Sequence, residues 1–220
     1  MGQMLEAIIF DLDGVLIHTE DMKVESWKRT LEKYNIKDGD SWYAKQIGTP
    51  GKKLAEIAVR DFSLPCEPES IFSVNREIYL SLLSGATATP ISSSLTFLKS
   101  IPKTRYKIGL ASSEYKAMIE HQVRRLGIYE LFDSIVSGVD EVKNDKPHPE
   151  IYLLIARKLN VDPMNCIAIE DSSTGVISAK SAGMKCIGYQ NSHSQDLSMA
   201  DIVVDGLTKL KLPQILQLFA

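Results

Sequence analysis

Short, continuous apolar runs that alternate with helical patterns constrain the fold of this chain more than any other feature. The runs occupy residues 5–10, 106–111, 134–137, 166–170 and 185–189, with a weaker one at 201–204. Because they do not alternate in polarity, they predict strands that are covered on both faces, as in parallel sheets. Helical spacing over 115–126, 149–159 and 174–182 lies between them. The sequence therefore predicts an α/β protein with a Rossmann-like parallel sheet flanked by helices.

Residues 18–85 interrupt this alternation with a long stretch that contains no strand pattern. Apolar residues recur there at helical spacing, as at Trp27, Leu31 and Tyr34. The stretch is too long for a loop in a compact domain. We therefore expect an inserted all-helical cap domain over 18–85 and a core domain made of 1–17 and 86–220.

Composition excludes several classes of function. The chain has 220 residues and a formal net charge of -3, without the basic surplus that nucleic-acid binding requires. Its apolar runs are too short to span a membrane, and the N-terminus lacks a signal-peptide pattern. The cysteines Cys66, Cys166 and Cys186 form no CxxC pair, which predicts free thiols in a reducing, cytoplasmic setting. Nothing in the sequence calls for more than a monomer.

Polar side chains follow four of the predicted strands. Ligands bind beyond the carboxyl ends of parallel strands, so these side chains are expected to meet at one edge of the sheet. They are Asp11 and Asp13 after 5–10, Ser112 and Ser113 after 106–111, Lys146 shortly after 134–137, Glu170 at the end of 166–170 and Asp171 directly after it.

Four carboxylates at one edge of a sheet require a compensating cation or protonation. Two unit charges about 4 Å apart repel by roughly 4 kcal/mol at an effective dielectric constant near 20. Hard oxygen ligands without a nearby histidine or cysteine favour Mg²⁺. A magnesium site that also contains a serine and a lysine suits a phosphate group, whose oxygens all three can contact.

Four motifs, in their order and spacing, closely resemble those of the haloacid dehalogenase superfamily. The resemblance is to its phosphatase and phosphomutase branch, which includes β-phosphoglucomutase, and it covers essentially the whole chain. The motifs are "DLDGVL", "LASS", "KPHPEIY" and "IEDSSTGVISAKSAGM".

The resemblance implies a role for each residue of the first motif. Asp11 would attack phosphorus and form an aspartyl-phosphate. Asp13 would act as general acid toward the leaving oxygen and then as base toward water, while its main-chain carbonyl binds Mg²⁺. The amides of Leu12 and Asp13 would hold the transferred phosphoryl group.

The resemblance also implies roles for residues of the other motifs and of the cap. Ser112 would donate to a phosphoryl oxygen, and Lys146 would neutralise the nucleophile and the phosphoryl group. Asp171 would complete the metal site, with Glu170 as a further ligand or as its support. Ser113 either contacts the ligand or caps the following helix. In the cap, Lys52 or its neighbour Lys53 would contact the distal part of the substrate, unless both are solvated lysines.

These roles predict a Mg²⁺-dependent phosphatase that hydrolyses a small phosphorylated metabolite, with a sugar phosphate as the favoured substrate. Asp13 argues against a dehalogenase, because halide leaves without a proton. A sugar phosphomutase is the first alternative, although Glu114 and Lys23 both depart from the mutase pattern. The second alternative is a binding or regulatory module that keeps the fold without turnover.

Overall fold

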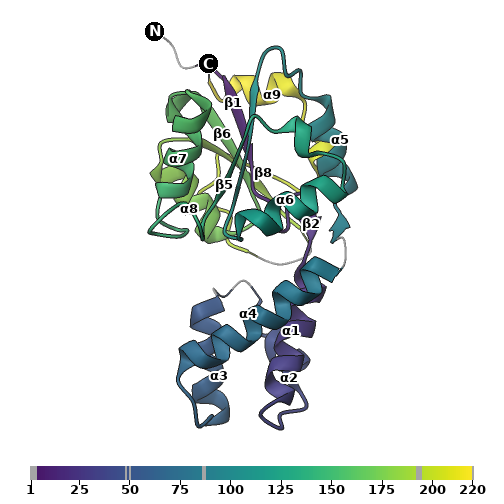
Figure 1. The fold of residues 1–220 in the computed structure, drawn as a ribbon. Helices are drawn as coiled ribbons and strands as arrows, with labels where there is room; N and C mark the ends of the chain where they lie inside the picture. The colour runs from purple at the N-terminus through teal and green to yellow at the C-terminus, as the bar shows by residue number, and fades with distance from the viewer. Residues whose placement is uncertain (1–3, 48, 50, 86–87, 192–194, 220) are drawn as a thin grey trace. The chain divides into compact units, whose positions relative to one another are not determined.

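The chain divides into two compact units, an α/β unit and a helical unit (Figure 1). The computed structural model describes residues 4–47, 49, 51–85, 88–191 and 195–219. The α/β unit consists of Met1–His18 and Thr89–Ala220, and the helical unit is Thr19–Ala88. The helical insertion expected over 18–85 overlaps the second of these units.

Six strands form the central sheet of the α/β unit. Their order is β5-β4-β1-β6-β7-β8, and every neighbouring pair is parallel. The parallel sheet predicted from the apolar runs is therefore confirmed. The strands are β1 (Ala7–Phe10), β4 (Lys107–Ser112), β5 (Ser134–Ser137), β6 (Cys166–Glu170), β7 (Lys185–Tyr189) and β8 (Ile202–Val204).

The direction of strand addition reverses beside β1. The chain adds β4 and then β5 on one side of β1, and later adds β6, β7 and β8 on the other side. Phe10 at the end of β1 pairs with Leu110 of β4 and with Ile169 of β6, so these three strands end at the same edge. In open α/β sheets, this edge beside the reversal is where ligands bind.

Helices cover both faces of the sheet, which explains why its central strands are largely apolar. All four residues of β1 are fully buried. Ile9 belongs to a core cluster with Ile155 of α7 and Val176 of α8, whereas the Phe10 ring lies 6.2 Å from the Phe97 ring of α5. The helices of this unit are α5 (Ser92–Ser100), α6 (Lys116–Arg125), α7 (Glu150–Leu159), α8 (Ser173–Ser181) and α9 (Leu212–Gln217), with 3₁₀ turns η1 (Tyr129–Leu131), η2 (Pro163–Asn165) and η3 (Leu207–Lys209).

The helical unit has an apolar core of its own. Trp27, Leu31 and Ile71 are buried in one cluster, as the helical spacing of the insertion predicts. Its longest helix is joined to the first by a polar contact as well, because the Asn75 amide donates to the Thr30 hydroxyl at 3.2 Å. The helices are α1 (Glu20–Glu32), α2 (Gly39–Ala44), α3 (Gly51–Phe62) and α4 (Pro68–Gly85).

A short antiparallel ribbon lies where the chain leaves and re-enters the α/β unit. Its strands are β2 (Ile17–His18) and β3 (Thr89–Pro90), with His18 paired to Thr89. His18, which was expected to open the insertion, therefore pairs within the α/β unit. No helix in the described part of the chain is long and apolar enough to cross a membrane.

Asp201 forms hydrogen bonds to both helix α8 and strand β7. A substitution at Asp201 therefore tests how much these contacts stabilise the fold. Its Oδ2 accepts hydrogen bonds from the Lys180 ammonium and from the Cys186 amide, both at 2.7 Å. Burial raises the pKa of the Asp201 carboxyl, but these two donors outweigh burial and hold the pKa below its ordinary value. The charged carboxylate therefore stabilises the folded state above the unfolded pKa of about 3.9, and this contribution is lost as the pH falls through the folded pKa.

We expect Asp201→Asn to lower the free energy of unfolding by about 1 kcal/mol near neutral pH, because the charge-assisted hydrogen bond to Lys180 is lost. The deficit should shrink as the pH falls from about 3.9 through the lowered pKa of the folded state, because the wild-type carboxylate then becomes protonated. Urea unfolding across this pH range measures both values. The control is Asp205→Asn, at an exposed ion pair with Lys209 (2.8 Å), which should change little. A deficit for Asp201→Asn that is independent of pH would contradict the assignment.

Candidate active site

The turn after β1 brings the chain back against the end of β6. Asp11 still belongs to the sheet, because its amide donates to the Ile169 carbonyl at 3.0 Å. Gly14 follows with a φ of +76°, and a Cβ atom on it would lie 1.9 Å from Oδ2 of Asp171. Only glycine fits this conformation and this close approach without displacing the carboxylate.

Lys146 reaches the end of β1 from the loop between β5 and α7. Its side chain is only 7% exposed. The ammonium Nζ lies 2.7 Å from Asp11 Oδ1 and 2.6 Å from Glu170 Oε1, and it donates to the Ala111 carbonyl at 3.2 Å. Burial alone would lower the pKa of this ammonium, but Asp11 and Glu170 raise the pKa above its ordinary value. Lys146 is therefore a charged residue that joins the ends of three strands.

The loop that carries Lys146 is held by carboxylates on both sides. Asp145 Oδ1 accepts from the Lys146 amide and from the Ser113 hydroxyl, each at 2.8 Å. Glu150, at the start of α7, accepts from the amide of Lys143 at 3.0 Å. Fixing the long Lys146 side chain in one position costs rotamer entropy. The hydrogen bonds from its loop to Asp145 and Glu150 help to offset this cost, because they hold the backbone that carries the ammonium.

Glu170 ends β6 as a fully buried carboxylate with donors on both oxygens. Oε1 accepts from Lys146 and from the Tyr152 hydroxyl at 2.6 Å, and Oε2 accepts from the Ser172 hydroxyl at 3.2 Å. Helix α8 passes close by at Gly175, where a Cβ would lie 2.0 Å from the Glu170 carboxyl carbon. These contacts satisfy a buried charge that would otherwise be very costly.

Three carboxylates of the α/β unit form an oxygen cluster that can hold a metal ion. Asp11, Glu170 and Asp171 each offer one oxygen, and these oxygens lie within 4.8 Å of one another. Lys146 supplies one positive charge, so the three ionised carboxylates would leave an excess of two negative charges. The donor set is all oxygen, which is the set that Mg²⁺ prefers. Both the charge and the chemistry of the cluster therefore fit a hard divalent cation.

Electrostatics at Asp11 show the same crowding of negative charge. Burial is the main reason that the pKa of Asp11 is held well above its usual range, and Lys146 opposes that effect. The carboxylates of Glu170, Asp171 and Asp13 raise the pKa of Asp11 further. A buried acid among like charges is an arrangement found often at functional sites.

The two serines at the end of β4, Ser112 within the strand and Ser113 after it, are directed differently. Ser112 is fully buried, and its hydroxyl oxygen accepts the amide of Glu114 at 3.2 Å. The Ser113 hydroxyl donates to Asp145, and the first amide of α6 donates to Asp140 Oδ2 at 2.7 Å rather than to the Ser113 hydroxyl. Ser113 is thus tied to the lysine loop and does not cap the helix.

The remaining predicted residues lie in two places. Leu12 is buried, and Asp13 bridges to Ile17 through the backbone in the turn after β1. Lys52 is an exposed residue of α3 in the helical unit, and its neighbour Lys53 pairs with Glu56 at 2.6 Å. The structure therefore brings together Asp11, Lys146, Glu170 and Asp171 and places Ser112 at the end of the neighbouring strand, whereas Lys52 belongs to the other unit.

Comparison with known proteins identifies the family. The family model for haloacid dehalogenase-like hydrolases matches residues 8–189, which include the carboxylate cluster and all of the sheet except Ala7 and strand β8. The chain belongs to the haloacid dehalogenase-like hydrolase family. The predicted family and the predicted class of enzyme, a hydrolase, are therefore confirmed.

Relatives within this family include phosphatases and a phosphomutase. A phosphorylated carbohydrates phosphatase from Thermotoga maritima is 33% identical over 217 residues, covering 96% of this chain and 97% of that protein. A β-phosphoglucomutase from Bacillus subtilis is 32% identical over 215 residues, covering 94% and 92%. Among solved structures, a β-phosphoglucomutase from Clostridium difficile is 30% identical, covers 98% of this chain and 97% of its own, and has a TM-score of 0.76.

Two residues that contact the carboxylate cluster are absent from the sequence-based prediction. Tyr152 lies within the apolar helical pattern of 149–159, and Asn191 follows the run 185–189. In the structure, the Tyr152 hydroxyl contacts Glu170, and the Asn191 amide contacts Asp171 Oδ2 at 2.6 Å. The signal for Asn191 is its place just beyond the end of a strand, as for Asp11 and Asp171.

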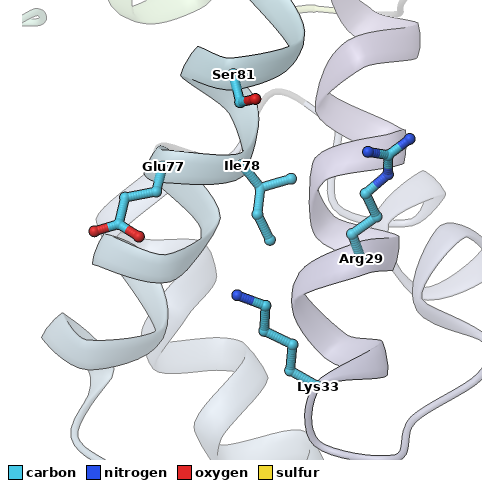
Figure 2. Close-up of a pocket in the computed structure, with 5 residues that line it drawn as sticks. All are labelled: Arg29, Lys33, Glu77, Ile78 and Ser81. Carbon is cyan, nitrogen blue, oxygen red and sulfur yellow. The ribbon is translucent and has the colours of Figure 1, made fainter.

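A hollow in the helical unit is a separate feature. It lies between α1 and α4, has a volume of about 300 Å³, and contains none of the residues of the carboxylate cluster (Figure 2). Its wall includes Arg29, which is already paired with Glu25 at 2.6 Å, and Glu77, whose charge would oppose a phosphate. We therefore assign no part of the active site to this hollow. Its lining consists of Arg29, Lys33, Glu77, Ile78 and Ser81.

Proposed function

We propose that this protein is a Mg²⁺-dependent phosphatase that hydrolyses a small phosphorylated sugar through an aspartyl-phosphate on Asp11. The observation that carries the proposal is the contact of Lys146 with both Asp11 and Glu170, at 2.7 and 2.6 Å, beside the oxygen cluster. A carboxylate, an ammonium and a cation site at one strand end are what phosphoryl transfer to an aspartate requires. The named activity of the Thermotoga maritima relative supports a sugar phosphate as substrate.

In this mechanism, an oxygen of Asp11 forms a bond to phosphorus while the bond from phosphorus to the ester oxygen breaks. Asp13 gives its proton to the leaving alcohol. Asp13 then takes a proton from a water molecule whose oxygen attacks the phosphorus of the aspartyl-phosphate. The second displacement releases inorganic phosphate and restores the carboxylate of Asp11.

Positive charge and hydrogen-bond donors hold the phosphoryl group during both displacements. Lys146 compensates charge on Asp11 and on the phosphoryl oxygens, and the Ser112 hydroxyl and the amides of Leu12 and Asp13 donate to those oxygens. Ser113 helps to position Lys146, because the Ser113 hydroxyl and the Lys146 amide both donate to Asp145 Oδ1.

Mg²⁺ would be held by Asp11, Asp171 and the main-chain carbonyl of Asp13, with Glu170 completing the oxygen cluster. When bound, the ion supplies charge stabilisation for the phosphoryl oxygens.

We further propose that the helical insertion is a cap domain that selects the substrate, with Lys52 as a contact for its distal part. Nucleic acid, a membrane or a second subunit is not needed, because one chain supplies every residue of the mechanism.

The test of the proposed function is phosphate release from p-nitrophenyl phosphate and from a panel of sugar phosphates. We expect release with Mg²⁺ and none after chelation with EDTA. If none of these substrates releases phosphate in a metal-dependent way, the proposal is contradicted and a binding or regulatory module is favoured.

A sugar phosphomutase is the second candidate, because the Bacillus subtilis β-phosphoglucomutase is 32% identical. A mutase returns the phosphoryl group to a sugar, so its turnover of a hexose 1-phosphate should depend on a sugar bisphosphate activator. A phosphatase releases inorganic phosphate without the activator. Measuring phosphate and hexose 6-phosphate in the same reaction separates the two.

Asp13→Asn should slow turnover by at least about 10²-fold, because the amide neither donates to the leaving oxygen as an acid nor accepts a proton from water. Substrates with a very acidic leaving group, such as p-nitrophenol, should lose less in the first displacement than sugar phosphates. Steady-state kinetics on both substrate types measures the difference. A loss of less than about threefold on sugar phosphates would argue against the acid–base role.

A further inference from the structure

Asn191 lies two residues beyond the end of β7 and points its side-chain amide at Asp171 of the carboxylate cluster. Its Nδ2 donates to Asp171 Oδ2 at 2.6 Å and contacts the Gly14 carbonyl oxygen at 3.4 Å. One amide group therefore bridges the end of β6 and the turn after β1. Asn191 is partly buried, so this contact is partly shielded from water.

The register of the sheet explains why Asn191 reaches this point. Glu170 of β6 pairs with Gly188 of β7, so the residues that follow each of them leave the sheet side by side. Gly14 makes room for the contact, because a Cβ on it would lie 2.9 Å from Asn191 Nδ2 as well as 1.9 Å from Asp171 Oδ2.

We propose that Asn191 is a positioning residue for Asp171 that sets the affinity of the site for its divalent cation. The inference rests on the proposed function, which makes Asp171 a metal ligand. A carboxylate offers about four acceptor positions on its two oxygens, so the amide takes one and leaves others for the cation. The amide is neutral, so it orients Asp171 without placing a positive charge beside a cation site. An ammonium at the same place would repel the cation.

Removing a group that orients a metal ligand typically lowers metal affinity by about 10- to 100-fold. We therefore expect Asn191→Leu, which keeps a similar side-chain volume but has no donor, to raise the dissociation constant for Mn²⁺ by at least about 10-fold. Asn191→Gln keeps the amide on a longer stem, and it should recover part of the lost affinity.

The experiment measures binding directly, without substrate. Mn²⁺ stands in for Mg²⁺, and electron paramagnetic resonance of the free ion gives the dissociation constant. The matched control is Asn165→Leu, because Asn165 Nδ2 donates to Glu6 Oε1 at the same distance of 2.6 Å, at the opposite edge of the sheet. This control should bind Mn²⁺ like wild type. Thermal unfolding in EDTA reports any loss of the fold in either variant.

The outcomes separate this inference from the proposed function. If Asn191→Leu binds Mn²⁺ within about twofold of wild type, or if Asn165→Leu loses as much affinity, the positioning role is wrong while the phosphatase proposal stands. If wild type binds Mn²⁺ and Asn191→Leu loses affinity but no phosphate ester is hydrolysed, the positioning role stands and the phosphatase proposal is wrong. If wild type binds no Mn²⁺, both the positioning role and the metal dependence are wrong.

Discussion

Asp11→Asn is expected to lower the turnover rate by at least about 10³-fold while leaving the protein folded. The amide is a far weaker nucleophile than a carboxylate, so the bond from residue 11 to phosphorus does not form. The fold should survive because asparagine has nearly the same shape and removes one of the crowded negative charges of the cluster. Lys146 keeps its contact with Glu170 at 2.6 Å.

Two measurements distinguish a lost nucleophile from a damaged protein. Acid-quenched wild type should carry a phosphoryl adduct during turnover, seen as a mass increase of the intact chain, and Asp11→Asn should carry none. Circular dichroism and urea unfolding should show that the variant remains folded. Asp205→Asn makes the same chemical change at an exposed ion pair with Lys209 and should keep full activity. Turnover of Asp11→Asn near the wild-type rate, or an adduct on another residue, would refute the mechanism.

The strands of the α/β unit could be predicted because burial on both faces leaves a direct mark on the sequence. Runs 134–137, 166–170 and 185–189 coincide with β5, β6 and β7. The first run was predicted to begin at Leu5, which is indeed buried, but β1 begins at Ala7, where pairing with its two neighbours starts. A hydrophobic pattern reports burial, whereas the bounds of a strand depend on hydrogen-bonded partners far away in the sequence.

The order of the strands also had to come from the structure. Apolar runs indicate that strands are parallel but not which of them are neighbours. The position of β1 between β4 and β6 decides that the Lys146 ammonium reaches both Asp11 and Glu170.

Residues of the candidate site were predictable where a charge follows a strand and hidden where a contact depends on packing. Asp11 directly follows β1 and Glu170 ends β6, so the strand-end rule places both at one edge of the sheet. Tyr152 has the spacing of a core residue on α7, and it is fully buried. Only the packing of α7 against the sheet brings its hydroxyl to Glu170. Sequence patterns do not distinguish such a tyrosine from a purely apolar one.

Removal of the Lys146 ammonium is expected to destabilise the protein strongly. Lys146→Met keeps a long apolar side chain but leaves the carboxylates of Asp11 and Glu170 without the ammonium that contacts both. Removing one partner of a buried ion pair typically costs about 3–5 kcal/mol. We expect a loss of this size in EDTA, together with loss of turnover. Mg²⁺ should restore part of the stability, because a bound cation compensates the same carboxylates.

Urea unfolding in EDTA and in Mg²⁺ measures both effects. The double variant Asp11→Asn/Lys146→Met should be more stable in EDTA than Lys146→Met alone, because it removes one of the two uncompensated charges. The control is Lys158→Met, which breaks the partly exposed ion pair of Lys158 with Glu141 and should cost no more than about 1 kcal/mol. If Lys146→Met is as stable as wild type in EDTA, the ammonium does not hold the buried carboxylates together. In that case, the excess negative charge that favours a divalent cation at this site must be balanced in another way.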